Sequence, residues 1–162
     1  MQELRRIEYL VTTFFGAGYF PKAPGTFASL VAFIPVLLIP NHLRLVILLP
    51  AVVIISILAI PLIARVEKDK GSDPSIVVID EVLGVWLIYC SPYIPISILS
   101  FISGITLFRL FDILKPSIIG KINAKSGAIY VLLDDLLAAV VTTILLHLLY
   151  FILKFIILIA FS

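Results

Sequence analysis

Five acidic residues stand within or beside stretches of sequence that are otherwise strongly apolar. They are Asp80, Glu81, Asp112, Asp134 and Asp135. An ionised carboxylate at the centre of a membrane costs about 2.5–3.5 kcal/mol. Carboxylates that gather at one place also repel one another. Such a group needs a counter-charge, which basic side chains or a divalent cation can supply.

Two sources of counter-charge fit the sequence. Arg109, Asp112 and Lys115 follow at intervals of three residues, so they lie within reach of one another on a helix that Pro116 then ends. Mg²⁺ prefers oxygen ligands, usually carboxylates together with water and substrate phosphates, whereas zinc prefers histidine and cysteine. Five acids against two nearby bases leave an excess of negative charge. All five are therefore candidate Mg²⁺ ligands and candidate catalytic residues.

A structural role is the alternative interpretation for each acid. Asp134 and Asp135 alone also fit an ordinary acidic helix N-terminus, where the helix dipole stabilises negative charge. Asp80 and Glu81 fit a solvated helix end less well, because they interrupt an apolar run.

The stretch GAGYFPKAPGTFASL at residues 16–30 is a candidate anion-binding element. Its glycines and prolines predict a tight loop, and Thr26 is the expected N-cap of a helix that begins near Phe27. The backbone amides of a helix start preceded by Gly25, with Lys22 nearby, can bind a phosphate. A connecting loop that merely caps a helix is the alternative.

The composition predicts a single integral membrane domain. Of 162 residues, 62% are hydrophobic and 14% charged, and the mean hydropathy is +1.22. Soluble domains are about half apolar and about a quarter charged. A net charge of +2 provides no basic surface for nucleic acid, and the single Cys90 excludes a disulfide framework.

The expected fold is an all-α, polytopic bundle of about five membrane segments over residues 16–162. The segments are 27–39, 45–64, 76–89, 96–108 and 136–153. Crossing the about 30 Å hydrocarbon core takes about 20 residues, so the three shortest segments must borrow polar residues, tilt or be re-entrant. Residues 1–15 predict an amphipathic helix in the membrane interface.

Charge sets the expected orientation. With five segments, ten of the twelve Lys and Arg residues fall on one side, and only Arg44 and Lys154 on the other. The positive-inside rule then places the N-terminus and the five acids on the cytoplasmic side. The acids would approach one another at one depth. The sequence does not indicate an oligomeric state.

Other functions and mechanisms fit less well. A small ion- or proton-coupled transporter also uses intramembrane carboxylates, but along a pathway near the midplane. A small structural subunit would explain the spans but not the clustered acids. His42 and His147 fall on the side opposite the acids, no base follows Cys90, and a Walker-type nucleotide loop is missing.

Four blocks of sequence closely resemble the bacterial phosphatidylglycerophosphatase A family. They are GAGYFPKAPGTFASL, DPSIVVIDEVLGVW, FRLFDILKPSIIG and LLDDLLAAV, in this order, and they extend roughly from Phe14 to Val140. The matching residues are Gly18, Pro24, Gly25, Thr26, Ser29, Asp73, Asp80, Glu81, Gly84, Arg109, Asp112, Lys115, Pro116, Asp134 and Asp135. One stretch and one single residue depart from the family pattern. Residues 121–130 lack the usual acid and glycine-rich turn, and Ala139 stands where glycine is usual.

The resemblance implies a Mg²⁺-dependent phosphatase of the bacterial inner membrane. Its substrate would be phosphatidylglycerophosphate and its products phosphatidylglycerol and phosphate. The five acids would bind one or two Mg²⁺ ions and position or deprotonate the attacking water, with an aspartyl phosphate left open. The expected phosphate-binding residues are Lys22, Gly25, Thr26, Ser29, Arg109 and Lys115.

Overall fold

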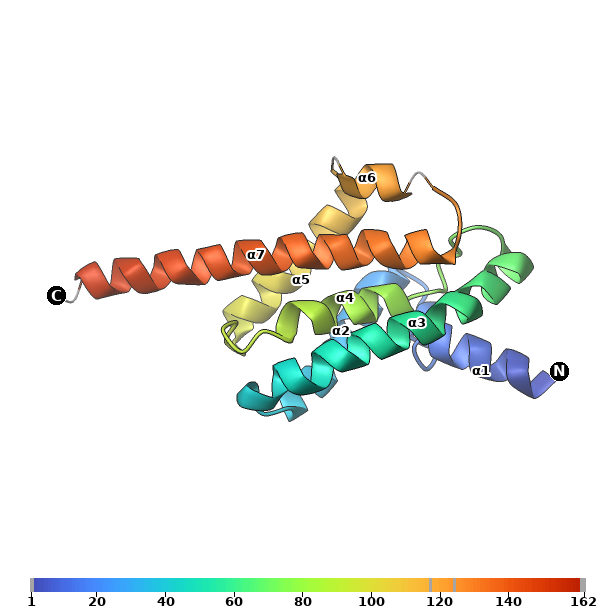
Figure 1. The fold of residues 1–162 in the computed structure, drawn as a ribbon, viewed down its shortest axis with the longest axis horizontal. Coiled ribbons are helices and arrows are strands. Elements are labelled where there is room, and N and C mark those ends of the chain that lie inside the picture. Colours follow the sequence, from blue (N-terminus) through green and yellow to red (C-terminus); the bar gives the residue numbers. More distant parts are fainter. Residues whose placement is uncertain (1, 117, 124, 161–162) are drawn as a thin grey trace.

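The computed structural model describes residues 2–116, 118–123 and 125–160. Within these residues the chain forms helices and loops and no strand, which confirms the predicted all-α fold (Figure 1). The helices are α1 (Gln2–Thr12), η1 (Ala17–Tyr19), α2 (Pro24–Leu38), η2 (Asn41–Leu43), α3 (Arg44–Lys70), α4 (Ile79–Tyr89), α5 (Ile98–Leu114), α6 (Ile118–Asn123) and α7 (Ala128–Ala160).

The short helix α4 lies at the centre of the bundle. It packs against α2, α3, α5 and α7, and most of its side chains are buried (Figure 1). Gly84 lets α5 approach, because a Cβ at this position would collide with the ring of Phe108. The first turn of α4, which carries Asp80 and Glu81, is thereby held inside the molecule.

Two helices of the described chain are long and apolar enough to cross a membrane, judged by length and composition. They are Asn41–Lys70, which includes η2, and Ala128–Ala160. Helices α2, α4 and α5 have 15, 11 and 17 residues and are too short to cross alone without tilting or polar flanks. The total of five membrane segments therefore stays a prediction.

Helix α1 turns its polar face to the protein and its apolar face outward. Glu8 is 8% exposed and accepts a hydrogen bond of 2.6 Å from Arg65 Nη1 on α3, whereas Ile7 is 54% exposed and Leu10 48%. A surface helix in water shows the reverse arrangement. The predicted amphipathic helix is confirmed for Gln2–Thr12, and its outward apolar face suits an apolar environment.

Candidate active site

All five acidic residues singled out in the sequence line one cavity of about 340 Å³. Asp80 and Glu81 come from the first turn of α4, Asp112 from the last turn of α5, and Asp134 and Asp135 from the second turn of α7. Four of the five residues are buried, and Glu81 is partly buried. Three helices thus bring the carboxylates together, as their positions in the apolar segments predicted.

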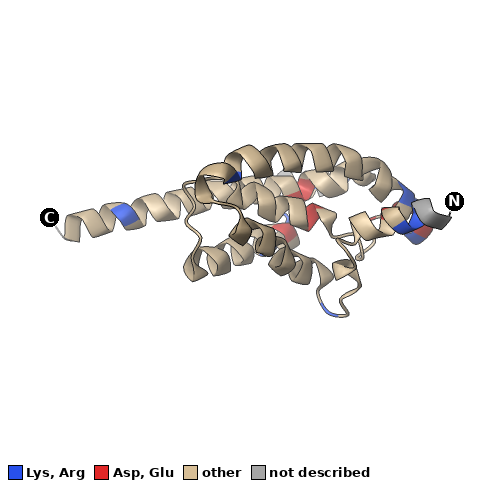
Figure 2. Cartoon of the chain, turned by 90° about the horizontal axis from the view of Figure 1, so that it is seen from below, with Lys and Arg blue, Asp and Glu red and all other residues tan. Residues whose placement is uncertain are grey.

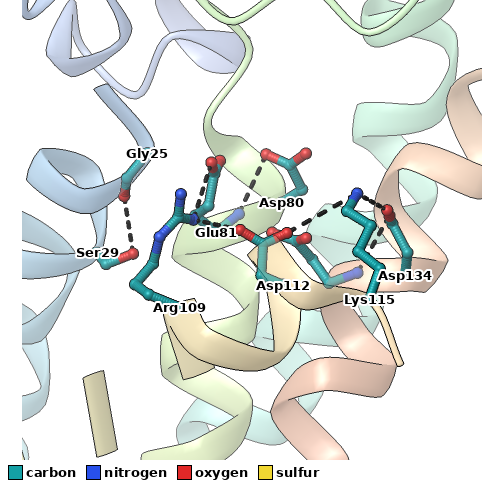
Figure 3. A network of polar contacts seen from close by, with 9 residues as sticks. Gly25, Ser29, Asp80, Glu81, Arg109, Asp112, Lys115 and Asp134 are labelled. Carbon is teal, nitrogen blue, oxygen red and sulfur yellow. Dashed lines mark hydrogen bonds and ion pairs between the residues drawn. The ribbon is translucent and has the colours of Figure 1, made fainter. Parts of the chain in front are cut away.

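Two basic residues of the same cavity neutralise part of this charge (Figure 3). Arg109 Nη1 lies 2.7 Å from Asp112 Oδ2 and 3.3 Å from Glu81 Oε1. Lys115 Nζ lies 3.9 Å from Asp112 Oδ1 and also pairs with Asp134 Oδ2. Glu81, Asp112 and Asp134 therefore each have a basic partner.

Glu81 also converges with the two carboxylates that have no basic partner in the described part of the chain, Asp80 and Asp135. Oxygen atoms of Asp80, Glu81 and Asp135 all lie within 4.8 Å of one another. Among the described residues, the buried Oε2 of Glu81 and the buried Oδ2 of Asp135 have no hydrogen-bond partner. Buried polar atoms normally have one. Three clustered carboxylates with two unpartnered oxygens suit a divalent cation that takes oxygen ligands.

Lys115 has its pKa shifted by its surroundings. Partial burial by itself lowers the pKa of the ammonium group, but the hydrogen bond to Asp134 and the charges of Asp134 and Asp112 raise it. The pKa of Lys115 consequently lies above the usual value for lysine. The cavity therefore contains a fixed positive charge at neutral pH.

Helix α2 begins at Pro24, so the prediction that Thr26 is its N-cap is wrong. Ala23 precedes the helix with φ 52°, and Pro24 is the first helical residue. Proline suits this position because its φ is already helical and its missing N–H would have no partner there. Ala23, Pro24 and Gly25 line the cavity. Thr26 lies in the first turn, outside the lining.

Gly25 brings the first turn of α2 against the acidic cluster. A Cβ at this position would overlap Oε1 of Glu81 and lie 3.1 Å from Nη1 of Arg109. The buried Ser29 donates a hydrogen bond of 2.8 Å to the Gly25 carbonyl and so supports the first turn of α2 (Figure 3). Ser29 lies outside the cavity lining. Lys22 is exposed in the preceding loop and also lies outside it.

The loop between α3 and α4 adds two polar residues that were not among the candidate site residues. Asp73 and Ser75 line the cavity. Asp73 has the left-handed φ of 49°, and its amide donates to Glu67 Oε1 at 3.2 Å. The available signal was the match of Asp73 to the family pattern, in the polar stretch that leads into α4. That signal gives no indication of which way the loop folds.

The fold and the site define a class of protein: a helical enzyme with an apolar exterior, whose charged cavity combines clustered carboxylates with bases of the kind that bind phosphate. The model of the phosphatidylglycerophosphatase A family matches residues 10–150. The chain belongs to this family and is a lipid phosphatase. Membership in an enzyme family gives no support to the transporter alternative.

Two curated relatives cover most of the chain. A protein of Haemophilus influenzae named "Phosphatidylglycerophosphatase A" is 32% identical over 139 residues, which are 84% of this chain and 84% of the relative. A protein of Bacteroides thetaiotaomicron named "Putative phosphatidylinositol-3-phosphatase" is 36% identical over 141 residues, which are 84% of this chain and 89% of the relative. No solved structure gives a significant match.

Proposed function

We propose that this protein hydrolyses the terminal phosphomonoester of phosphatidylglycerophosphate and yields phosphatidylglycerol and phosphate. The reaction would take place with Mg²⁺ at the cytoplasmic face of a bacterial inner membrane, in a protein that crosses the membrane several times. One observation carries the proposal: three converging carboxylates share a cavity with Arg109 and Lys115. Family membership supports the choice of substrate.

Asp80, Glu81 and Asp135 would hold the metal ion. A bound Mg²⁺ polarises a phosphoryl oxygen and lowers the pKa of bound water. A carboxylate of this cluster would accept a proton from the attacking water and pass it to the departing glycerol oxygen. The net reaction adds the oxygen of water to phosphorus, breaks the bond between phosphorus and the glycerol oxygen, and leaves a proton on that oxygen.

Arg109 and Lys115 would bind the oxygens of the departing phosphate. Guanidinium and ammonium groups form strong, charge-assisted hydrogen bonds to phosphate, and they stabilise the charge that develops in the transition state. Asp112 and Asp134 hold these two bases beside the cavity through the ion pairs described above. We therefore assign Asp112 and Asp134 a positioning role, separate from the metal ligands.

The apolar exterior supports a lipid substrate. Leu30, Ile34 and Leu37 are exposed on α2, the helix whose first turn borders the cavity. Lipid chains would remain in the bilayer beside such a surface while the phosphorylated headgroup enters the cavity. The exposed faces of α3 and α7 are similarly apolar.

Phosphate release from phosphatidylglycerophosphate in detergent tests the proposal. The purified protein should release phosphate with Mg²⁺, and it should lose this activity with EDTA and in Asp80→Asn and Asp135→Asn variants. Lys68→Gln, which changes an exposed cation on α3, is the matched control and should remain active. Metal-independent release, or full activity in both site variants, would contradict the proposal.

Phosphatidylinositol 3-phosphate should be tested as a second substrate in the same assay. The relative from Bacteroides thetaiotaomicron is named for phosphatidylinositol 3-phosphate, and it is as extensively matched as the other relative. Both names denote a phosphomonoester on a polyol headgroup. We propose phosphatidylglycerophosphate as the better substrate, so a higher kcat/KM with phosphatidylinositol 3-phosphate would reverse this assignment.

A further inference from the structure

The two ends of the bundle differ in charge. Residues 9–66, 82–111 and 136–162 contain no acidic residue. In Figure 2 the acidic segments lie in the middle of the molecule and toward the N-terminus, and the half toward the C-terminus of α7 has none. The charged residues remaining at that end are Arg44 and Lys154. An anion that binds there meets no carboxylate of the described chain.

A second cavity, of about 540 Å³, lies at this positive end. Its lining includes Asn41, Tyr93, His147, Tyr150 and Lys154. The three residues from α7 follow at intervals of three and four, so they share one helix face. The cavity thus combines an ammonium group, an amide and aromatic rings, which is the chemistry found at the headgroup level of a membrane.

Hydrogen bonds fix one wall of this cavity. Nδ1 of His147 lies 2.7 Å from the carbonyl oxygen of Thr143, which can only accept, so Nδ1 is the donor. Nε2 of His147 lies 2.8 Å from Oγ of Ser91, and the amide of Tyr93 donates to the same oxygen at 3.3 Å. Contacts within the protein therefore hold this wall in place.

The buried Arg44 fixes the other wall. Its guanidinium donates to the carbonyl oxygens of Tyr89 at 3.3 Å and Ile94 at 2.9 Å, and to Oδ1 of Asn41. Because the Asn41 oxygen is engaged in this way, its NH₂ group is the end that remains to donate. Asn41 and Lys154 line the same cavity, so the NH₂ group of Asn41 is available as a hydrogen-bond donor at this site.

The distance along α7 places the second cavity relative to the first. Asp134 and Lys154 are separated by twenty residues of one continuous helix, which is about 30 Å at 1.5 Å per residue. This length matches the thickness of the hydrocarbon core. If the catalytic cavity opens at one membrane surface, Lys154 lies at the level of the opposite one.

We propose that the second cavity binds the phosphodiester of an anionic phospholipid in the leaflet opposite the catalytic cavity. Lys154 supplies the counter-charge and Asn41 a hydrogen bond to the phosphate. A zwitterionic phosphocholine headgroup binds less well, since its own cation would lie near Lys154 without a carboxylate to receive it. The inference rests on the membrane location given under the proposed function.

Thermal unfolding and native mass spectrometry of the detergent-solubilised protein test this site. Dioleoylphosphatidylglycerol should raise the Tm of the protein and remain bound to it in the native mass spectra. Dioleoylphosphatidylcholine should raise the Tm much less and should be retained much less. Lys154→Gln should weaken the apparent affinity for phosphatidylglycerol about fivefold, the effect of one lysine near an anionic lipid. Asn41→Ala should weaken it as well, and Lys154→Arg should retain it. Lys68→Gln, at the other end of α3, is the control.

An Asp135→Asn variant separates this site from the catalytic cavity. We expect it to lose phosphatase activity and to keep the stabilisation by phosphatidylglycerol. Stabilisation lost in Asp135→Asn but kept in Lys154→Gln would place the lipid in the catalytic cavity and overturn the inference. Equal effects of the two lipids, or an equal effect of inorganic phosphate alone, would also overturn it.

Discussion

Gly25 on α2 lies directly against the carboxylate of Glu81 on α4, with no room for a Cβ between them. This contact joins the start of one helix to the acid pair at the start of another. Glu81 can then reach Arg109 while it remains beside Asp80 and Asp135. The missing side chain at position 25 is therefore part of the geometry of the site.

Gly25→Ala should leave a folded protein with at least about tenfold lower kcat. Alanine is a better helix former than glycine by about 1 kcal/mol, so α2 itself should not be weakened. The loss would come from displacement of Glu81. Phosphate release and Tm are measured together, with Leu30→Ala on the exposed face of α2 as the control. An alanine variant with unchanged kcat would show that Glu81 can move without consequence.

The carboxylates should divide into two groups in a Mg²⁺ titration. Glu81→Gln and Asp135→Asn should raise the Mg²⁺ concentration that half-saturates the protein in a direct binding measurement at least about tenfold, since each removes a proposed ligand. Asp112→Asn should lower kcat and leave that concentration nearly unchanged, because its partners are Arg109 and Lys115. The same shift in all three variants would argue for a shared metal-binding role.

The ion pair between Lys115 and Asp134 should stabilise the fold up to alkaline pH. A lysine pKa that is raised in the folded state contributes stability that is complete below the unfolded value, about 10.4, and is lost as the pH rises through the folded value. The Tm difference between the wild type and Lys115→Gln should therefore be constant from about pH 7 to 9. It should decrease only above about pH 10.4. A difference that vanished near pH 8 would contradict this expectation.

Gly84→Ala should destabilise the bundle by about 1–3 kcal/mol, the usual range for overpacking a core. The added methyl group would meet the ring of Phe108, which is fully buried and has little room to move. Denaturation in mixed detergent measures the change in the free energy of unfolding, and Ile102→Ala on the exposed face of α5 is the control variant. A Gly84→Ala variant as stable as the wild type would mean that α5 can move to accept the methyl group with no loss of stability.

The sequence predicted the helices and the meeting of the acids, because apolar runs and charged interruptions are local patterns. It did not predict where α2 begins. Thr26 has a good capping side chain, but Pro24 starts the helix earlier through its fixed φ. Nor could it separate Asp80, Glu81 and Asp135, whose oxygens converge, from Asp112 and Asp134, which both pair with Lys115. That division depends on which oxygens lie near Arg109 and Lys115, and only the packing of α4, α5 and α7 sets these distances.

The helix against which α1 packs was also beyond the sequence. An interfacial helix turns its apolar face to the membrane, but its pattern of apolar and polar residues does not identify the partner of its polar face. The pair between Glu8 and Arg65 decides the matter, and its two members lie 57 positions apart. The position of Asp73 in the cavity was beyond the sequence as well, because the ends of α3 and α4 determine the path of the loop that carries it.

The enclosure of α4 has a consequence for biogenesis. Its 11 residues extend only about 16 Å and include two acids in the first turn, so the segment cannot enter a bilayer stably alone. It needs neighbours on every side, and α7, one of those neighbours, is synthesised after it. Asp134 and Asp135 arrive on that same helix. The acidic cavity can consequently be assembled only when α7 is in place, so a nascent chain that has not reached Asp135 cannot form it.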